Sequence, residues 1–110
     1  MTELDALLLS LVIEVPIATA IAAWLRLPDR RRIATVAVLA TCFTHVFVWL
    51  LGTTWPRVLM LEVAIIPVEA LCYVVAAGVA ARYALFISAV TNVSSFGAGL
   101  ALFAMLRVLT

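Results

Sequence analysis

Long apolar runs separated by short polar turns dominate the chain. The runs cover residues 4–25, 33–51, 58–81 and 83–106. Each is close to the ~20 residues that cross ~30 Å of hydrocarbon as a helix. The pattern therefore predicts an all-α fold, a membrane-spanning antiparallel four-helix bundle, in which residues 1–110 form a single four-helix transmembrane domain.

Turn-forming and charged residues mark the boundaries between the runs. Residues 28–32 close the first hairpin with proline, aspartate and three arginines, and residues 52–57 close the second with glycine and proline. Arg82 is the only interruption between the last two runs, so a very tight third turn is expected there.

The distribution of arginines predicts the orientation of the bundle. The first and third connections carry most of them, namely Arg26, Arg30, Arg31, Arg32 and Arg82, whereas Arg57 and Arg107 belong to the opposite side. Because cytoplasmic loops are enriched in basic residues, we expect both termini on the outer side of a cell (inner) membrane, with the chain as a multi-pass protein.

Three tryptophans lie near the ends of the expected spans. Trp24, Trp49 and Trp55 all stand where an amphipathic ring prefers the headgroup region of the bilayer. This location explains them without a ligand, so the sequence does not favour Trp49 or Trp55 as part of a ligand cage.

Two glutamates interrupt the apolar runs, each two residues from a proline. Glu14 precedes Pro16 in the first run, and Glu69 follows Pro67 in the third. An ionisable group at bilayer depth costs roughly 2.5 to 3.5 kcal/mol on insertion scales, so it is kept where it has a partner or a task. Both glutamates are therefore expected to turn inward, away from lipid.

Polar residues of all four runs fall at a similar depth. At 1.5 Å per residue, Glu14, Glu69 and Ser95 come near the midplane, with His45 and Asn92 within about one turn. The depths predict an interior polar cluster. Its expected ion or proton site is Glu14, His45 and Glu69, with supporting neighbours Glu62, Tyr73, Asn92 and Ser95.

Composition supports the membrane assignment and excludes some partners. Hydrophobic residues make up 67% of the chain and charged residues 12%, against about 25% charged in soluble domains. The lipid bilayer is therefore the expected partner. The seven basic residues are offset by six acidic ones, so nucleic acid is not expected to bind.

The polar cluster permits three classes of function. The first is binding or conduction of a proton or a divalent metal ion, with Glu14, His45 and Glu69 as the metal ligands and with Cys42 and Cys72 as less favoured ones. Carboxylates with one imidazole suit a divalent metal such as zinc, manganese or iron as a cofactor.

The second class is an accessory subunit whose polar core only holds its own helices together. Small residues in the third and fourth runs would then mediate a homo-oligomer or docking onto a larger membrane complex. The third class is an intramembrane enzyme acting on a lipid-like substrate. No hydrolase motif is present in the sequence, so no catalytic residue is assigned and an enzyme is the less favoured interpretation.

The arrangement of polar residues resembles a family of small, uncharacterised bacterial four-helix membrane proteins. The resemblance spans the chain and rests on Glu14 and Pro16 in the first run, Thr44, His45 and Trp49 in the second, Glu62 and Glu69 in the third, and Asn92 and Ser95 in the fourth. The family more often has asparagine and proline where this chain has Thr41 and Val46. The resemblance implies the fold but no particular activity.

Four spans in 110 residues and a glutamate in the first span are also similar to small multidrug resistance transporters. That family carries an aromatic and glycine-rich signature in its third helix, where this chain has Glu62, Pro67 and Glu69. It also has no counterpart of His45. Membership is therefore rejected, and proton-coupled transport remains one form that the first class of function can take.

Overall fold

The computed structural model describes residues 2–109, and in this part of the chain every regular element is an α-helix. The helices are α1 (Glu3–Trp24), α2 (Arg30–Leu51), α3 (Trp55–Ala77) and α4 (Ala81–Leu109). All four are long and apolar enough to cross a membrane. The predicted all-α four-helix architecture is confirmed, and the chain has the makeup of a multi-pass membrane protein.

Side chains cap the starts of α1 and α2. The Asp5 backbone N–H donates to the Thr2 hydroxyl at 3.2 Å, and the Thr2 N–H donates to the Asp5 carboxylate at 3.0 Å, forming a capping box. At α2, the Arg32 N–H donates to the Asp29 carboxylate at 3.2 Å. Because Asp29 caps the helix, Arg30, Arg31 and Arg32, which are expected in the connection, form the first turn of α2, whereas Arg26 does lie in the connection.

The third connection lies earlier in the chain than predicted. Helix α3 ends at Ala77 because Gly78 adopts a left-handed conformation with φ of 66°, and the Val79 N–H donates back to the Tyr73 carbonyl at 3.2 Å. The expected boundary at residues 81–83 is therefore wrong. Arg82 lies in the first turn of α4, where its guanidinium donates to the Tyr83 hydroxyl at 3.0 Å.

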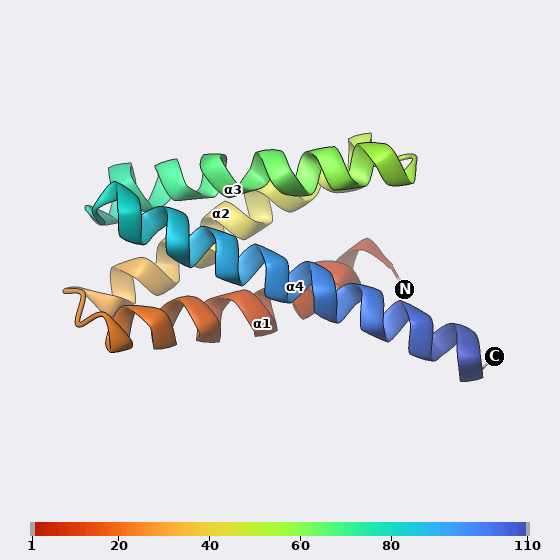
Figure 1. Cartoon of the computed structure of the whole chain (residues 1–110), viewed down its shortest axis with the longest axis horizontal. Coiled ribbons are helices and arrows are strands. Elements are labelled where there is room, and N and C mark those ends of the chain that lie inside the picture. Colours follow the sequence, from red (N-terminus) through yellow and green to blue (C-terminus); the bar gives the residue numbers. More distant parts are fainter. Residues whose placement is uncertain (1, 110) are drawn as a thin grey trace.

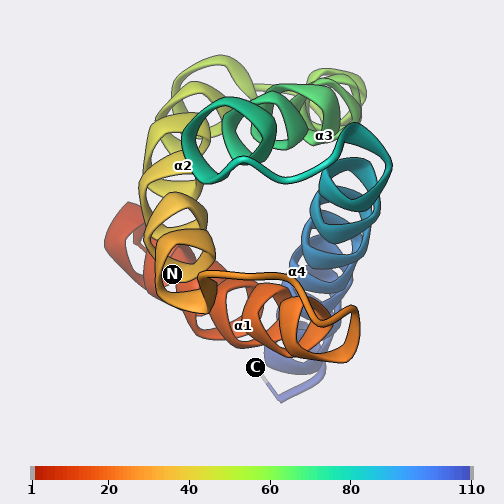
Figure 2. The ribbon, with the colours of Figure 1, turned by 90° about the vertical axis from the view of Figure 1, so that its left-hand side faces the viewer.

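The helices form a closed four-membered ring. Helix α1 packs against α2 and α4, and α3 packs against the same two helices. Among the described residues the diagonal pairs make no close backbone contact, and Figure 2 shows the resulting square arrangement seen along the bundle. Side chains that point inward from all four helices therefore meet around a common axis.

Successive helices run in opposite directions, which separates the turns into two ends. The α1–α2 and α3–α4 turns lie at one end, and the α2–α3 turn lies at the other end with both chain ends (Figure 1). We call the first the arginine-rich end, because it carries Arg26, Arg30, Arg31, Arg32 and Arg82. We call the second the terminal end.

The half of the bundle toward the arginine-rich end has an apolar core. Its fully buried members include Ala18, Ala22, Ile33, Ala84 and Ile87, each 0% exposed. Small residues on α1 and α4 let these helices approach closely, which is how helices associate where lipid supplies no hydrophobic drive. We call this region the apolar plug, and its described members are apolar except for Tyr73.

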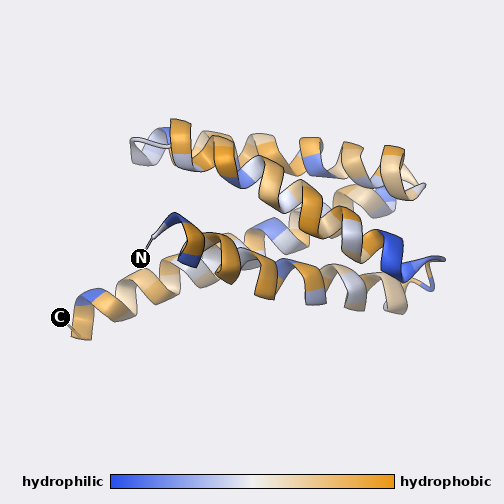
Figure 3. Ribbon diagram, turned by 180° about the vertical axis from the view of Figure 1, so that it is seen from behind, coloured by the Kyte–Doolittle hydropathy of each residue, from blue (hydrophilic) through white to orange (hydrophobic). Residues whose placement is uncertain are grey.

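Large apolar side chains cover the outer faces of the bundle. Val12, Val63 and Val75 are each about 70% exposed, at 70%, 68% and 74%. Figure 3 shows the predominantly hydrophobic ribbon and the strongly hydrophilic first turn of α2 at the arginine-rich end. An apolar exterior around a partly polar interior is the arrangement that a lipid environment favours.

Candidate functional site

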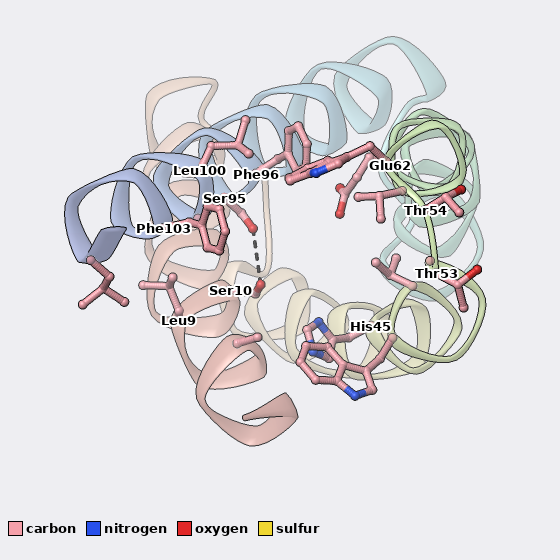
Figure 4. A pocket seen from close by; sticks show the side chains of 18 of the residues that line it. Leu9, Ser10, His45, Thr53, Thr54, Glu62, Ser95, Phe96, Leu100 and Phe103 are labelled. Atoms are coloured by element: carbon pink, nitrogen blue, oxygen red, sulfur yellow. Dashed lines mark hydrogen bonds between the residues drawn. The ribbon is translucent and has the colours of Figure 1, made fainter. Parts of the chain in front are cut away.

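A large cavity opens at the terminal end of the bundle. Its volume is about 820 Å³, and residues of all four helices and of the α2–α3 turn line it. We call it the vestibule. Most of its wall is apolar or aromatic, and Figure 4 shows Phe96, Leu100 and Phe103 of α4 on one side of it.

A second, much smaller cavity continues from the floor of the vestibule toward the bundle centre. It holds about 20 Å³, which is enough for roughly one water molecule. Ten residues line it, and they are Ser10, Glu14, Thr41, Thr44, His45, Val48, Glu62, Ile65, Asn92 and Ser95. We call this the central polar cavity. Eight of its ten lining residues are polar or ionisable, and five of them, Glu14, His45, Glu62, Asn92 and Ser95, belong to the sequence-predicted cluster.

Five residues line both cavities and therefore mark where they adjoin. They are Ser10, His45, Val48, Glu62 and Ser95. Figure 4 shows Glu62 on α3 and His45 on α2 extending into the same space, with Ser10 and Ser95 joining α1 to α4 beside them. The Ser95 hydroxyl donates to the Ser10 hydroxyl at 3.4 Å.

Glu14 lies at the middle of α1 and faces the central polar cavity. Only 4% of the residue is exposed. Ser95 on α4 is its polar neighbour, and its charge interacts with those of Glu69 and Glu62. None of the described residues forms an ion pair with Glu14. The carboxyl group therefore has like-charged neighbours and no cationic partner among residues 2–109.

Glu69 belongs to a hydrogen-bond network between α3 and α4. The Asn92 amide donates to the Glu69 carboxyl at 3.0 Å and to the Ser88 carbonyl at 2.8 Å. The Ser88 hydroxyl donates to the carbonyl of Ile66, the residue just before Pro67, at 2.7 Å. Glu69 is 3% exposed and does not line the central polar cavity, but its hydrogen-bond donor Asn92 does.

His45 occupies the floor of the vestibule. Its ring stacks on Trp49 with the centroids 6.0 Å apart and an interplanar angle of 25°. The His45 Nε2 atom is buried and has no hydrogen-bond partner among residues 2–109. A buried polar atom without a partner is costly, so this atom is a candidate contact for water or a ligand.

The sequence-predicted residues thus divide into those that line the central polar cavity and those that do not, and Glu69 belongs to the second group. Glu14, His45, Glu62, Asn92 and Ser95 line one cavity, as expected of an interior cluster. Tyr73 packs in the apolar plug with 3% of it exposed, and the free cysteines Cys42 and Cys72 are half-buried away from both cavities.

The expected metal ligands are not grouped as a metal site would require. Within the described residues, no three His, Cys, Asp or Glu side chains come together in an arrangement that holds a metal ion. Glu14 and His45 share the central polar cavity, but the Glu69 carboxyl is directed toward Asn92.

Sequence reasoning missed two parts of the site. Ser10 lies one helical turn before Glu14, and this i,i+4 spacing was the available signal. Trp49 and Trp55, which were explained as interfacial residues, line the vestibule. Their contribution depends on how the helix ends converge, and the sequence carries no signal for that.

Comparison with protein-family models, with curated proteins and with solved structures gave no match for this chain. The site therefore has to be interpreted from its own geometry.

Proposed function

We propose that this chain is a multi-pass inner-membrane protein that binds and exchanges a proton at Glu14, within a site that includes His45, Glu62 and Ser95. The observation that carries the proposal is the position of Glu14. Its carboxyl is buried at mid-helix and faces a water-sized polar cavity that adjoins the vestibule. A carboxyl held in this way needs neither a lipid contact nor a protein cation if a proton neutralises it.

The polar route from the vestibule supports exchange rather than permanent protonation. His45, Glu62, Ser10 and Ser95 each touch both cavities, and all four carry groups that bond water. A proton can therefore move between the vestibule and Glu14 through side chains or water.

A proton fits this geometry better than a divalent metal. A structural or catalytic metal site usually takes three or four protein ligands, and the described residues offer no such group. A proton needs only a carboxyl and a hydrogen-bonding neighbour, which Glu14 and Ser95 provide.

The arginine distribution supports an orientation with both termini outside. The antiparallel ring collects five of the seven arginines at one end. By the positive-inside rule this end faces the cytoplasm, and the vestibule then opens to the outer side.

Infrared difference spectroscopy on the purified protein in lipid tests the proton site. A protonated carboxyl has a carbonyl band that an ionised one lacks, so a pH step produces a difference signal. We expect the variant Glu14→Gln to lose a band that the variant Glu3→Gln keeps, because Glu3 is exposed at the start of α1. An unchanged set of carboxyl bands in Glu14→Gln would remove Glu14 as the proton site.

A second candidate is a structural role for the polar core in an accessory subunit of a larger membrane complex. The Glu69–Asn92–Ser88 network favours it, since each hydrogen bond joins or braces α3 and α4. If Glu14→Gln, His45→Ala and Glu69→Gln leave the pH response intact and a larger subunit co-purifies with the native chain, this candidate replaces the proton site.

A further inference from the structure

Three features of the vestibule suit a bound ligand. It is large, its walls carry aromatic rings, and a carboxylate without an ionic partner stands at its floor. We propose that the vestibule binds an amphipathic organic cation, whose charged group lies against Glu62 and whose apolar body lies against the rings above it. The proposal rests on the proposed function only in placing the vestibule next to Glu14.

The size and lining of the vestibule match a small-molecule site. Its volume of about 820 Å³ falls in the range of about 300 to 1,000 Å³ that drug-sized ligands occupy, in clefts that are mostly apolar with a few polar groups. Trp49, Trp55, Phe96 and Phe103 supply four rings from α2, α3 and α4. Aromatic faces attract cations through their quadrupole, and most strongly where water is excluded.

Charge selects a cation over a neutral or anionic ligand. Glu62 lines both the vestibule and the central polar cavity, and within residues 2–109 it makes no hydrogen bond or ion pair. The only arginine in the wall is Arg107, which lies over the Phe103 ring at 5.8 Å. Arg107 is twelve residues beyond Ser95 on α4, roughly 18 Å along the axis, so it does not neutralise the floor.

The unpartnered His45 Nε2 atom is an independent sign that the site is incomplete without a ligand. It is buried, and the His45 side chain faces the same space as Glu62 (Figure 4). An occupant of the vestibule, or water that it orders, supplies the missing partner.

Quenching of tryptophan fluorescence tests the proposal with 1-benzylpyridinium as the probe. The full chain is used in lipid nanodiscs in a Trp24→Phe background, because Trp24 lies at the arginine-rich end while Trp49 and Trp55 line the vestibule. We expect saturable quenching that diphenylmethane, a neutral molecule of the same shape, does not displace.

Two variants separate charge from shape. Glu62→Gln should weaken the probe about tenfold or more, since it removes the desolvated counter-charge, whereas Glu3→Gln makes the same change in net charge outside the cavity and should leave binding unchanged. Phe96→Leu keeps an apolar side chain and should weaken binding about threefold through loss of one ring. This variant keeps the proposal testable if Glu62→Gln fails to fold.

The outcomes distinguish this inference from the proton site. Quenching that never saturates, equal affinity in Glu62→Gln, or displacement by diphenylmethane would overturn the cation site and indicate a cavity filled by lipid. The Glu14 infrared band is measured on the same samples. If that band shows no pH response while the probe still binds, the proton site alone is contradicted. The vestibule is then supported as an independent cation site.

Discussion

The interaction between Asn92 and Glu69 offers the sharpest test of what stabilises the bundle. Asn92→Ala removes the 3.0 Å hydrogen bond to the Glu69 carboxyl, which is the side chain bond that directly joins α3 to α4 at this level. It leaves a carboxyl that is 3% exposed without its amide donor.

The expected cost follows from the environment of the bond. Hydrogen bonds between membrane helices contribute about 0.6 kcal/mol on average and up to about 1.7 kcal/mol, and leaving a buried polar group unsatisfied costs about 1–3 kcal/mol. Asn92 is 6% exposed and Glu69 is nearly inaccessible, so relief by water is limited. We therefore expect Asn92→Ala to lower the free energy of unfolding by about 2 kcal/mol.

Unfolding in mixed micelles, followed by circular dichroism, measures this cost. Thr91→Ala is the matched control, because Thr91 is adjacent, 2% exposed and bonded at 3.1 Å to the Ser88 carbonyl of its own helix. The control should cost clearly less, since no interhelical bond is lost. A double-mutant cycle with Glu69→Ala, which removes the acceptor, should give a coupling energy of about 1 kcal/mol.

A stabilising role of the Asn92–Glu69 bond is refuted if Asn92→Ala is no more destabilising than Thr91→Ala, or if the cycle shows no coupling. Either result would mean that the network fills space between α3 and α4 without stabilising their contact. Glu69 would then need another explanation for its place in the bundle.

Two further predictions concern the third turn and the access route. Gly78→Ala should destabilise the protein by about 1 kcal/mol, because φ is 66° there while nothing lies within 4 Å of an added Cβ, and Gly78→Asn should recover part of that loss; equal thermal stability of the two variants would contradict this. In a background with Cys42 and Cys72 replaced by serine, Ser10→Cys should react with a water-soluble maleimide while Ile87→Cys should not, because Ser10 lines the vestibule and Ile87 is 0% exposed in the plug. Equal labelling rates would refute the one-sided access.

The sequence predicts the four helices well because the length of each apolar run is enough to indicate a helix, whatever the periodicity of its residues. In lipid, a run of about 20 apolar residues specifies a helix by length and composition alone. The predicted third turn is misplaced because Arg82 is the charged residue between the two apolar runs, whereas Gly78 ends α3 through its backbone conformation. A single glycine among small residues is a weak signal beside a charge.

The sequence predicts how deep each polar residue lies in the bilayer but not the direction in which its side chain points. Counting 1.5 Å per residue places Glu14, His45, Asn92 and Ser95 at neighbouring levels, and in the structure these four line one cavity. Depth alone does not say which way a side chain turns. Glu69 has the same depth as Glu14 by this count, yet its carboxyl meets the Asn92 amide in the α3–α4 contact.

The vestibule could not be predicted from the sequence, because it arises from the packing of helix ends. Apolar residues such as Leu100 and Phe103 have the same hydropathy whether they face lipid or a cavity. Helix α4 has 29 residues, more than any other helix of the described chain, and its last turns extend past the ring (Figure 1). The space beside these turns is therefore a property of the assembled bundle.

The two halves of the bundle differ in a way that bears on transport. At the terminal end, polar residues line the vestibule and the central polar cavity between the opening and Glu14. Toward the arginine-rich end, Ala18, Ala84 and Ile87 are packed at 0% exposure, and Tyr73 is the one polar side chain among the described members of the plug. If Glu14 exchanges a proton as proposed, this packing favours its return to the vestibule in this conformation. Transport across the membrane would thus require the plug helices to separate, as in a carrier with alternating access, and a continuously open channel does not fit this packing.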